Sequence, residues 1–96
     1  MKYFAVTREH GSSWNESLPM SEQRNYSQHS DYMGTLFDKG FVILGGPIGD
    51  GKRILLIYNT EDEKLLQTWL ADDPWTPLDV LKTIKIEPWE ILIKKD

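Results

Sequence analysis

Blocks of apolar residues, separated by polar, glycine-containing or proline-containing stretches, divide the chain into six predicted elements. Runs of β-branched and aromatic residues favour extended backbone and predict strands at residues 2–7, 41–48, 52–60 and 83–95. Two segments with apolar residues spaced by three and four positions predict helices, the first over residues 20–39 and the second between Thr60 and Pro74.

One apolar stripe runs along the first predicted helix, formed by Tyr26, His29, Met33, Leu36 and Phe37. Gly40 suits the left-handed backbone position that closes a helix. The second helix is expected to begin with a capping box, in which Thr60 and Glu63 satisfy each other's free backbone N–H groups. Pro74 ends this helix because it cannot continue the hydrogen-bond ladder. The stripe of the second helix consists of Leu65, Leu66, Trp69 and Leu70.

The order strand, helix, strand, strand, helix, strand is the split β-α-β arrangement of ferredoxin-like folds, βαββαβ. We therefore expect an α+β chain with a four-stranded antiparallel sheet and a hairpin turn at residues 49–51. Pro88 lacks an N–H, which places the last strand at a sheet edge or at a bulge. Residues 54–58 are apolar without alternation, as in a strand buried on both faces. Two helices cover only one face, so we expect a homodimer whose sheets pack face to face.

Length, charge and cysteine content exclude several classes of protein. With 96 residues we expect one domain, spanning residues 1–96. The net charge of −4, from 15 acidic and 11 basic residues, argues against a nucleic-acid or membrane surface. There is no cysteine, and no apolar run is long enough for a signal peptide or a membrane span, so a cytoplasmic protein is expected. Only two histidines are present and they lack ligand spacing, which argues against a metal centre.

A few residues could carry chemistry. His29 interrupts an apolar stripe, so its ring either finds a partner in the core or faces a cleft. Asp72 and Asp73 stand before Pro74, where short acidic residues are common at helix ends and turns. Trp75 follows them and, with Trp14 in a polar loop, is placed near a pocket; the alternative for both is a core or interface position. Arg8, at the end of the first strand, either holds an anionic substrate or is an exposed surface arginine.

Three segments, "HSDYMGTLFDKGFVILGGPIGDG", "ADDPW" and the terminal "IKIEPWEI", together resemble the YCII-related family of small dimeric α+β barrel proteins. The family pattern is a helix histidine, a glycine closing that helix, a strand ending in Gly-Pro, and a second helix ending in Asp-Pro-aromatic. The matching residues are His29, Gly40, Gly46, Pro47, Asp73, Pro74 and Trp75. The resemblance runs from about Tyr26 to the C-terminus, whereas the loop at residues 9–20 is longer and more polar than the family pattern.

The resemblance implies a ferredoxin-like subunit, a homodimer that forms a dimeric α+β barrel, and a His-Asp pair in a cleft. If Asp73 accepts a hydrogen bond from one ring nitrogen of His29, it fixes the tautomer and strengthens the other nitrogen as a base. His29 would then be the catalytic base and Asp73 its orienting partner. By position, Gly46 would let the backbone approach a substrate, Trp75 would stack on a planar ring, and Arg8 would hold an anionic group.

We therefore expect a cofactor-independent lyase or isomerase, similar to a dehydrochlorinase or to muconolactone isomerase, that acts on a small cyclic or enolisable molecule. It would need no metal. Two alternatives stay open. The first is a non-catalytic small-ligand binding or accessory domain, in which the pair only orients a ligand. The second is a haem-handling or monooxygenase member of the broader barrel superfamily, which would need His29 free to ligate iron.

Overall fold

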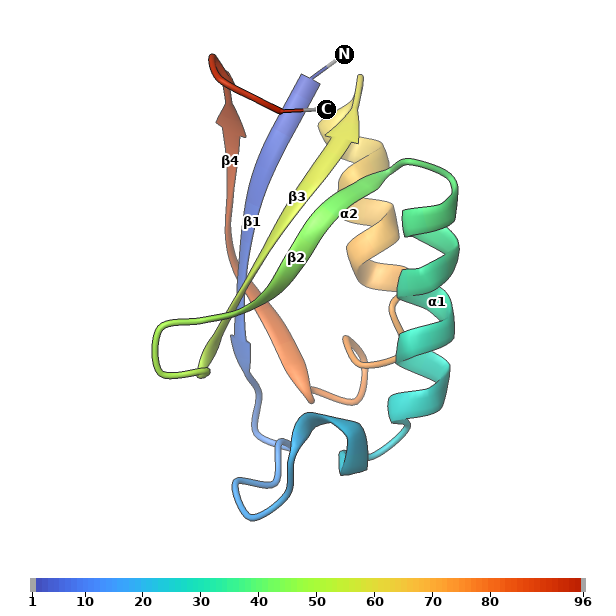
Figure 1. Cartoon of the computed structure of the whole chain (residues 1–96). Coiled ribbons are helices and arrows are strands. Elements are labelled where there is room, and N and C mark those ends of the chain that lie inside the picture. The colour runs from blue at the N-terminus through green and yellow to red at the C-terminus, as the bar shows by residue number, and fades with distance from the viewer. Residues whose placement is uncertain (1, 96) are drawn as a thin grey trace.

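The computed structural model describes residues 2–95, which form a sheet with helices on one of its faces (Figure 1). The strands are β1 (Lys2–His10), β2 (Val42–Ile48), β3 (Arg53–Thr60) and β4 (Leu81–Trp89). The helices are α1 (Tyr26–Asp38), α2 (Glu63–Asp72) and the short 3-10 helix η1 (Met20–Glu22). Figure 1 shows α1 and α2 side by side on the same face of the sheet.

The strand order is β2-β3-β1-β4, and all neighbouring strands are antiparallel. This confirms the ferredoxin-like α+β fold that the order of the elements predicts. Since β4 pairs with β1 alone, Pro88 lies in an edge strand, as expected from its missing N–H. The β1–β4 ladder also shifts register between Thr7 and Arg8. The last strand begins two residues earlier than predicted and ends at Trp89, so residues 90–95 are not part of it.

The helix predicted at residues 20–39 is wrong at its start. Residues 20–22 form η1, the backbone is extended at Gln23, and α1 begins only after Asn25, which is left-handed with φ 55°. The side chain of Gln23 explains the break, because its Nε2 donates to the Asn15 and Leu18 carbonyls at 2.7 and 2.9 Å. These bonds tie the loop after β1 to this point of the chain. The end was predicted correctly: Gly40 is left-handed with φ +81°.

The predicted capping box of the second helix is also wrong. Asp62 is the N-cap of α2, and its Oδ1 accepts the N–H of Lys64 at 2.8 Å. Thr60 is still in β3 and uses its hydroxyl within the turn, where Oγ1 accepts the Asp62 N–H. Asp is a strong N-cap residue, so it replaces the Thr60–Glu63 box two positions later.

The core lies between the helices and the sheet. Along β1 and β3 alternate residues point to it, which is the two-residue period of a strand. Leu66 and Leu70 of α2 and Leu36 of α1 close it, whereas Leu65 of the predicted stripe is exposed. The strand residues of this core are Phe4, Val6, Val42, Ile54, Leu56, Tyr58 and Leu81.

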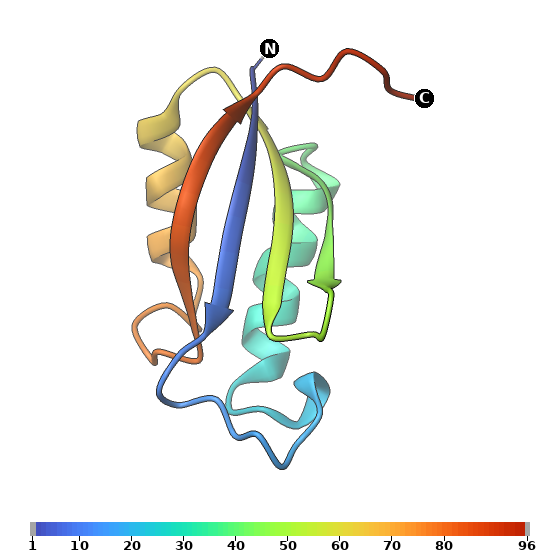
Figure 2. The same cartoon turned by 90° about the vertical axis from the view of Figure 1, so that its left-hand side faces the viewer.

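The opposite face of the sheet has no helix over it among residues 2–95, as Figure 2 shows from that side. Leu44 lies opposite Ile57 in the register, and Leu44 is 59% exposed while Ile57 is buried. Trp89 is also exposed at the far end of the same face. The apolar character of β3 on both faces is therefore confirmed. The homodimer that would cover this face stays a prediction.

No helix within residues 2–95 has the length and apolar character needed to cross a membrane.

Candidate active site

The end of α2 turns one carboxylate into the protein and leaves the other outside. Asp72 is the last helical residue and is exposed, whereas Asp73 has extended backbone, with φ −61° and ψ 124°, and is 1% exposed. Pro74 disfavours helical backbone at the residue before it, which rotates the Asp73 side chain inward. There Oδ1 of Asp73 accepts the Trp75 N–H at 2.9 Å, as in an Asx turn. The two aspartates of this turn are thus not equivalent.

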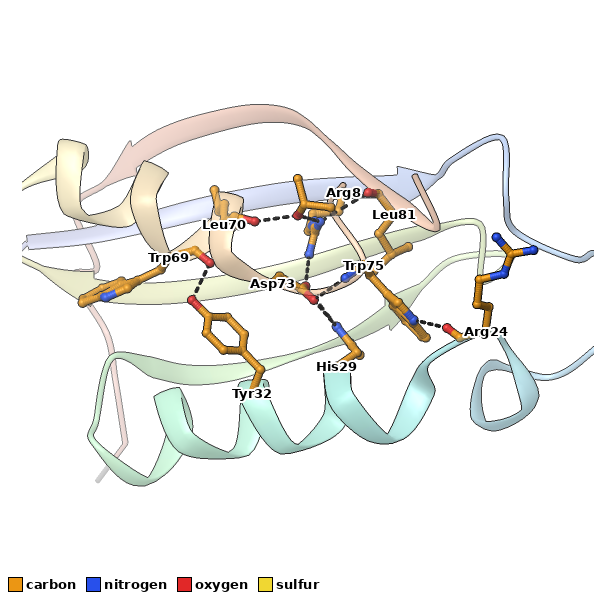
Figure 3. A network of polar contacts seen from close by, with 10 residues as sticks. Arg8, Arg24, His29, Tyr32, Trp69, Leu70, Asp73, Trp75 and Leu81 are labelled. Carbon is orange, nitrogen blue, oxygen red and sulfur yellow. Dashed lines mark hydrogen bonds and ion pairs between the residues drawn. The ribbon is translucent and has the colours of Figure 1, made fainter. Parts of the chain in front are cut away.

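His29 faces Asp73 from α1, across 44 residues of sequence (Figure 3). Its Nδ1 lies 2.8 Å from Oδ1 and 3.0 Å from Oδ2 of Asp73. A carboxylate only accepts hydrogen bonds, so Nδ1 carries the hydrogen and Nε2 is the nitrogen left for other chemistry. The structure therefore brings the predicted His-Asp pair together within hydrogen-bond distance.

Arg8 reaches the same carboxylate from β1. Its Nη1 lies 2.6 Å from Oδ2 of Asp73, and its Nη2 donates to Thr76 Oγ1 at 2.9 Å and to the Leu81 carbonyl at 3.3 Å. The arginine side chain is 0% exposed. The alternative of an exposed surface arginine is therefore wrong. The guanidinium of Arg8 is buried and forms an ion pair with the buried carboxylate of Asp73. The site is a triad of Arg8, Asp73 and His29.

Asp73 stays ionised in this setting. Burial raises the pKa of Asp73, but the hydrogen bonds from His29 and the Trp75 N–H, together with the charge of Arg8, hold that pKa below its usual value of 3.8. The carboxylate therefore orients His29 and takes no proton itself near neutral pH.

The indole ring of Trp75 packs against the imidazole ring of His29. Its ring stacks on the imidazole of His29 with centroids 3.8 Å apart and planes 7° apart, and its Nε1 donates to the Arg24 carbonyl. Trp75 is 0% exposed and does not line the cavity next to His29. The expected stacking of Trp75 on a substrate is thus not what this geometry offers. The indole instead packs against the imidazole of His29 and fixes its plane.

A cavity of about 170 Å³ opens beside His29, between α1 and the sheet. Its two ionisable lining residues are Arg8 and His29. Its apolar wall consists of Met20, Met33, Ile54, Leu56 and Leu81, and the end of β2 adds Gly45, Gly46 and Pro47. Larger hollows of the described chain lie elsewhere and contain neither His29 nor Arg8.

The two glycines of this wall differ. Gly46 lines the cavity, as expected, but a Cβ added there would meet no atom within 4 Å. A Cβ on Gly45 would come within 2.3 Å of Leu56 Cδ2, so Gly45 is the position where only glycine lets β2 approach β3 without moving the cavity wall.

Sequence reasoning missed Thr76 and the apolar wall. Thr76 holds the triad in place, because its Oγ1 accepts from Arg8 and donates to the Leu70 carbonyl. No local pattern around Thr76 signals this, since its partners lie on β1 and α2. Met33 could have been placed at the cavity, because it follows His29 by one turn on the same stripe. Within residues 2–95, no group of three or more histidine, cysteine or acidic residues could hold a metal ion.

Comparison with solved structures gives a likeness that covers most of the chain. No family model matches the chain, and no curated protein matches it. Among solved structures, the chain is similar to the 5-chloro-2-hydroxyhydroquinone dehydrochlorinase TftG from Burkholderia phenoliruptrix AC1100, in complex with 2,5-dihydroxybenzoquinone. The sequences are 26% identical, the TM-score is 0.68, and the match covers 92% of this chain and 93% of the dehydrochlorinase. The likeness therefore extends over almost the whole of both folds.

Proposed function

We propose that this protein is a cofactor-independent lyase that removes a proton and a leaving group such as chloride from a small enolisable ring. The observation that carries the proposal is the His29–Asp73 hydrogen bond of 2.8 Å at the wall of an apolar cavity. The likeness to a dehydrochlorinase supports the reaction class. Both agree with membership of the YCII-related family, which we include in the proposal.

His29 is the base in this mechanism. Asp73 accepts the Nδ1–H, so the lone pair of Nε2 is free to take a proton from a carbon next to a carbonyl group. The side-chain hydrogen bonds of His29 within residues 2–95 are both made by Nδ1. A chlorohydroquinone ring offers this reactive C–H in its keto tautomer, in which the carbon that carries hydrogen and the carbon that carries chlorine are neighbouring sp3 atoms. The electron pair of the broken C–H bond then forms the double bond between these two carbons, and chloride departs with its own bonding pair. His29 then loses the proton to solvent.

The test is chloride release from 5-chloro-2-hydroxyhydroquinone, with His29→Gln and His10→Gln as a matched pair. Loss of a general base costs about 10²–10⁴-fold in rate, so we expect that fall in kcat for His29→Gln alone. His10→Gln is the control, because His10 also stacks on a tryptophan but does not line the cavity. Equal rates in wild type and His29→Gln would show that His29 is not the base.

The same assay decides between catalysis and binding alone. Saturable binding of 2,5-dihydroxybenzoquinone with no chloride release above the uncatalysed rate would favour the non-catalytic ligand-binding domain.

We also propose the homodimer. Leu44 on β2 and Trp89 on β4 leave apolar surface on the face of the sheet that no helix of residues 2–95 covers, and a second copy of that face would bury it. Leu44→Glu should convert the protein to a monomer in analytical ultracentrifugation. Phe37→Glu is a matched control, because Phe37 is 58% exposed but belongs to α1 on the other side of the molecule. A wild-type monomer at high micromolar concentration would overturn this proposal.

A further inference from the structure

Arg8 acts on the site through Asp73, because its side chain is 0% exposed and reaches no ligand atom. Its Nη1 lies 2.6 Å from Oδ2 of Asp73. Nδ1 of His29 contacts the same carboxylate, at 2.8 Å from Oδ1 and 3.0 Å from Oδ2. Figure 3 shows the guanidinium and the imidazole with this carboxylate between them. The charge of Arg8 and any charge on His29 are therefore separated by a single acidic group.

A buried carboxylate has two opposite effects on the histidine that it orients. Its hydrogen bond to Nδ1–H fixes the tautomer, which leaves the lone pair of Nε2 free to accept a proton. Its negative charge also favours the imidazolium, because an opposite charge within about 4–6 Å stabilises the charged form. An imidazolium has no free lone pair, so the second effect works against a histidine that is to serve as a base.

The charge of Arg8 removes the second effect and leaves the first. A guanidinium stays protonated in proteins, so Arg8 and Asp73 form a neutral pair as long as His29 is neutral. Protonation of His29 would give this group a net charge of +1 at a place where Asp73 is 1% exposed, and buried net charge is unfavourable. The hydrogen bond from Nδ1 needs only an accepting oxygen, which Asp73 still offers.

The other groups around His29 add no buried charge to this balance. Tyr32 and Tyr58 interact electrostatically with Asp73, but burial raises the pKa of both tyrosines, so they are neutral near pH 7. The residues from η1, β2, β3 and β4 that line the hollow beside His29 are apolar or glycine. The charged residues next to it along α1 and at the end of α2 are exposed and screened by water: Arg24, Asp31 and Asp72.

We propose that Arg8 is a positioning residue that keeps His29 unprotonated near neutral pH, because it cancels the charge of Asp73 and leaves the hydrogen bond of Asp73 to the imidazole intact. The inference rests on the proposed function for one point, that His29 serves as a base. It also gives a reason for the last step of that reaction, since a protonated His29 leaves the triad with a net charge that is relieved by loss of the proton to solvent.

A ¹H NMR titration of the histidine rings tests this without a substrate, because the chain has two histidines and His29→Gln identifies their signals. In wild type we expect His29 to be mostly neutral at pH 7. Arg8→Gln removes the positive charge but keeps a hydrogen-bond donor, so the titration midpoint of His29 should rise by about 1–3 pH units. Arg8→Lys keeps the charge and should stay closer to wild type. Arg24→Gln removes an exposed arginine charge and is the matched control, with no shift expected.

The double variant Arg8→Gln/Asp73→Asn keeps the test decisive if Arg8→Gln does not fold, because removal of both members of a buried ion pair costs less than removal of one. If the two charges cancel at His29, its midpoint stays close to that of wild type. If Asp73 acts on His29 and Arg8 does not, loss of the carboxylate lowers the midpoint by about 1–3 pH units. That fall would overturn the inference, as would an unchanged midpoint in folded Arg8→Gln.

Chloride release separates this inference from the proposed function. Arg8→Gln should lose activity at pH 7 and regain it at higher pH, with the acid limb of kcat/KM moving together with the NMR midpoint. A merely structural role of Arg8 would lower the rate at every pH. A raised midpoint in Arg8→Gln without chloride release by wild type would remove the proposed function alone. Chloride release that depends on His29, with no movement of the midpoint in Arg8→Gln, would remove this inference alone.

Discussion

The two histidines of this protein occupy nearly the same local environment and yet differ in what they can do. His29 stacks on Trp75 at 3.8 Å and 7°, and His10 stacks on Trp14 at 3.7 Å and 8°. Their side chains are 12% and 13% exposed. Stacking and burial are therefore the same at both places, and neither of them makes a histidine a base.

The carboxylate beside each ring makes the difference. Asp73 is buried, lies 2.8 Å from His29 and is itself held by Arg8, whereas Glu16 lies 3.5 Å from His10 and is 72% exposed. An exposed side chain pays an entropy cost to stay in one geometry and is screened by water, so it fixes no tautomer. His29 lines a cavity as well, and His10 does not. The comparison shows that the rigid support of the carboxylate, rather than the histidine, defines the site.

The largest difference between the two histidine sites is expected when the carboxylate beside each histidine is neutralised. Asp73→Asn leaves the buried Arg8 without its anion, and removal of one partner of a buried ion pair costs about 3–5 kcal/mol. Glu16→Gln at the exposed pair should change the free energy of unfolding little. Urea denaturation of both variants measures the difference. Equal small effects would mean that Asp73 is no better supported than Glu16.

The sequence predicts this contrast only in part. The pairing of His29 with Asp73 was expected from the family resemblance, and the βαββαβ fold was expected from the apolar pattern; the fold is confirmed. The burial of Arg8 was not predictable with certainty, because its partner Asp73 is 65 residues away and a lone arginine at a strand end looks the same whether it is buried or exposed. Trp75 was expected at the pocket wall, but it stacks on His29 outside the lining of the cavity, held there by its bond to the Arg24 carbonyl.

The errors in the predicted starts of α1 and α2 have a related cause. The start of α1 and the N-cap of α2 were misplaced because Gln23 and Asp62 use side-chain hydrogen bonds that override propensity. Such bonds depend on which carbonyl or N–H happens to lie within reach. Periodicity describes which face of an element is buried, and it carries no information on that geometry.

The next comparison is between Trp75, which stacks on His29, and Trp14, which stacks on His10. Trp75→Phe removes the donor to the Arg24 carbonyl and part of a fully buried ring, so we expect a loss of about 1–3 kcal/mol in the free energy of unfolding. It should also lower kcat for chloride release, since His29 loses the surface that fixes its plane. Trp14→Phe, at a half-buried ring, should cost less stability and leave kcat unchanged. If Trp14→Phe lowered kcat equally, the two stacks would form one functional unit through their edge contact of 6.0 Å.

Acid titrates all carboxylates of the chain, and Asp73→Asn removes one of these titrations, that of Asp73. The pKa of Asp73 lies below 3.8 in the folded protein, mainly because the bonds from His29 and Trp75 outweigh the effect of burial. The unfolded chain then binds the Asp73 proton at a higher pH than the folded chain does. The contribution of Asp73 to the free energy of unfolding is therefore complete above the ordinary pKa of an aspartate, and it is lost as pH falls through the folded pKa. Urea midpoints measured between about pH 5 and pH 2 should decline in wild type and in Glu16→Gln. The decline should be shallower in Asp73→Asn, which has no proton to take up there; parallel curves would show that Asp73 contributes nothing.

The smallest expected effect is the change that the charges at the end of α2 make to the pKa of Tyr32. Tyr32 follows His29 by three residues on α1 and donates its hydroxyl hydrogen to the Trp69 carbonyl at 2.6 Å. Burial raises the pKa of Tyr32 from 10.0 to about 12, with smaller contributions from the carboxylates of Asp72 and Asp73. Asp72→Asn should therefore lower this pKa slightly, to a value still above 10.0, in an absorbance titration of the tyrosines. The phenol is held neutral in the fold, so stability is full below the ordinary pKa of tyrosine and falls as pH rises through about 12. If the pKa of Tyr32 did not change in Asp72→Asn, water would screen the charge of Asp72 completely. That result would sharpen the distinction between the exposed carboxylates of Asp72 and Glu16 and the buried carboxylate of Asp73.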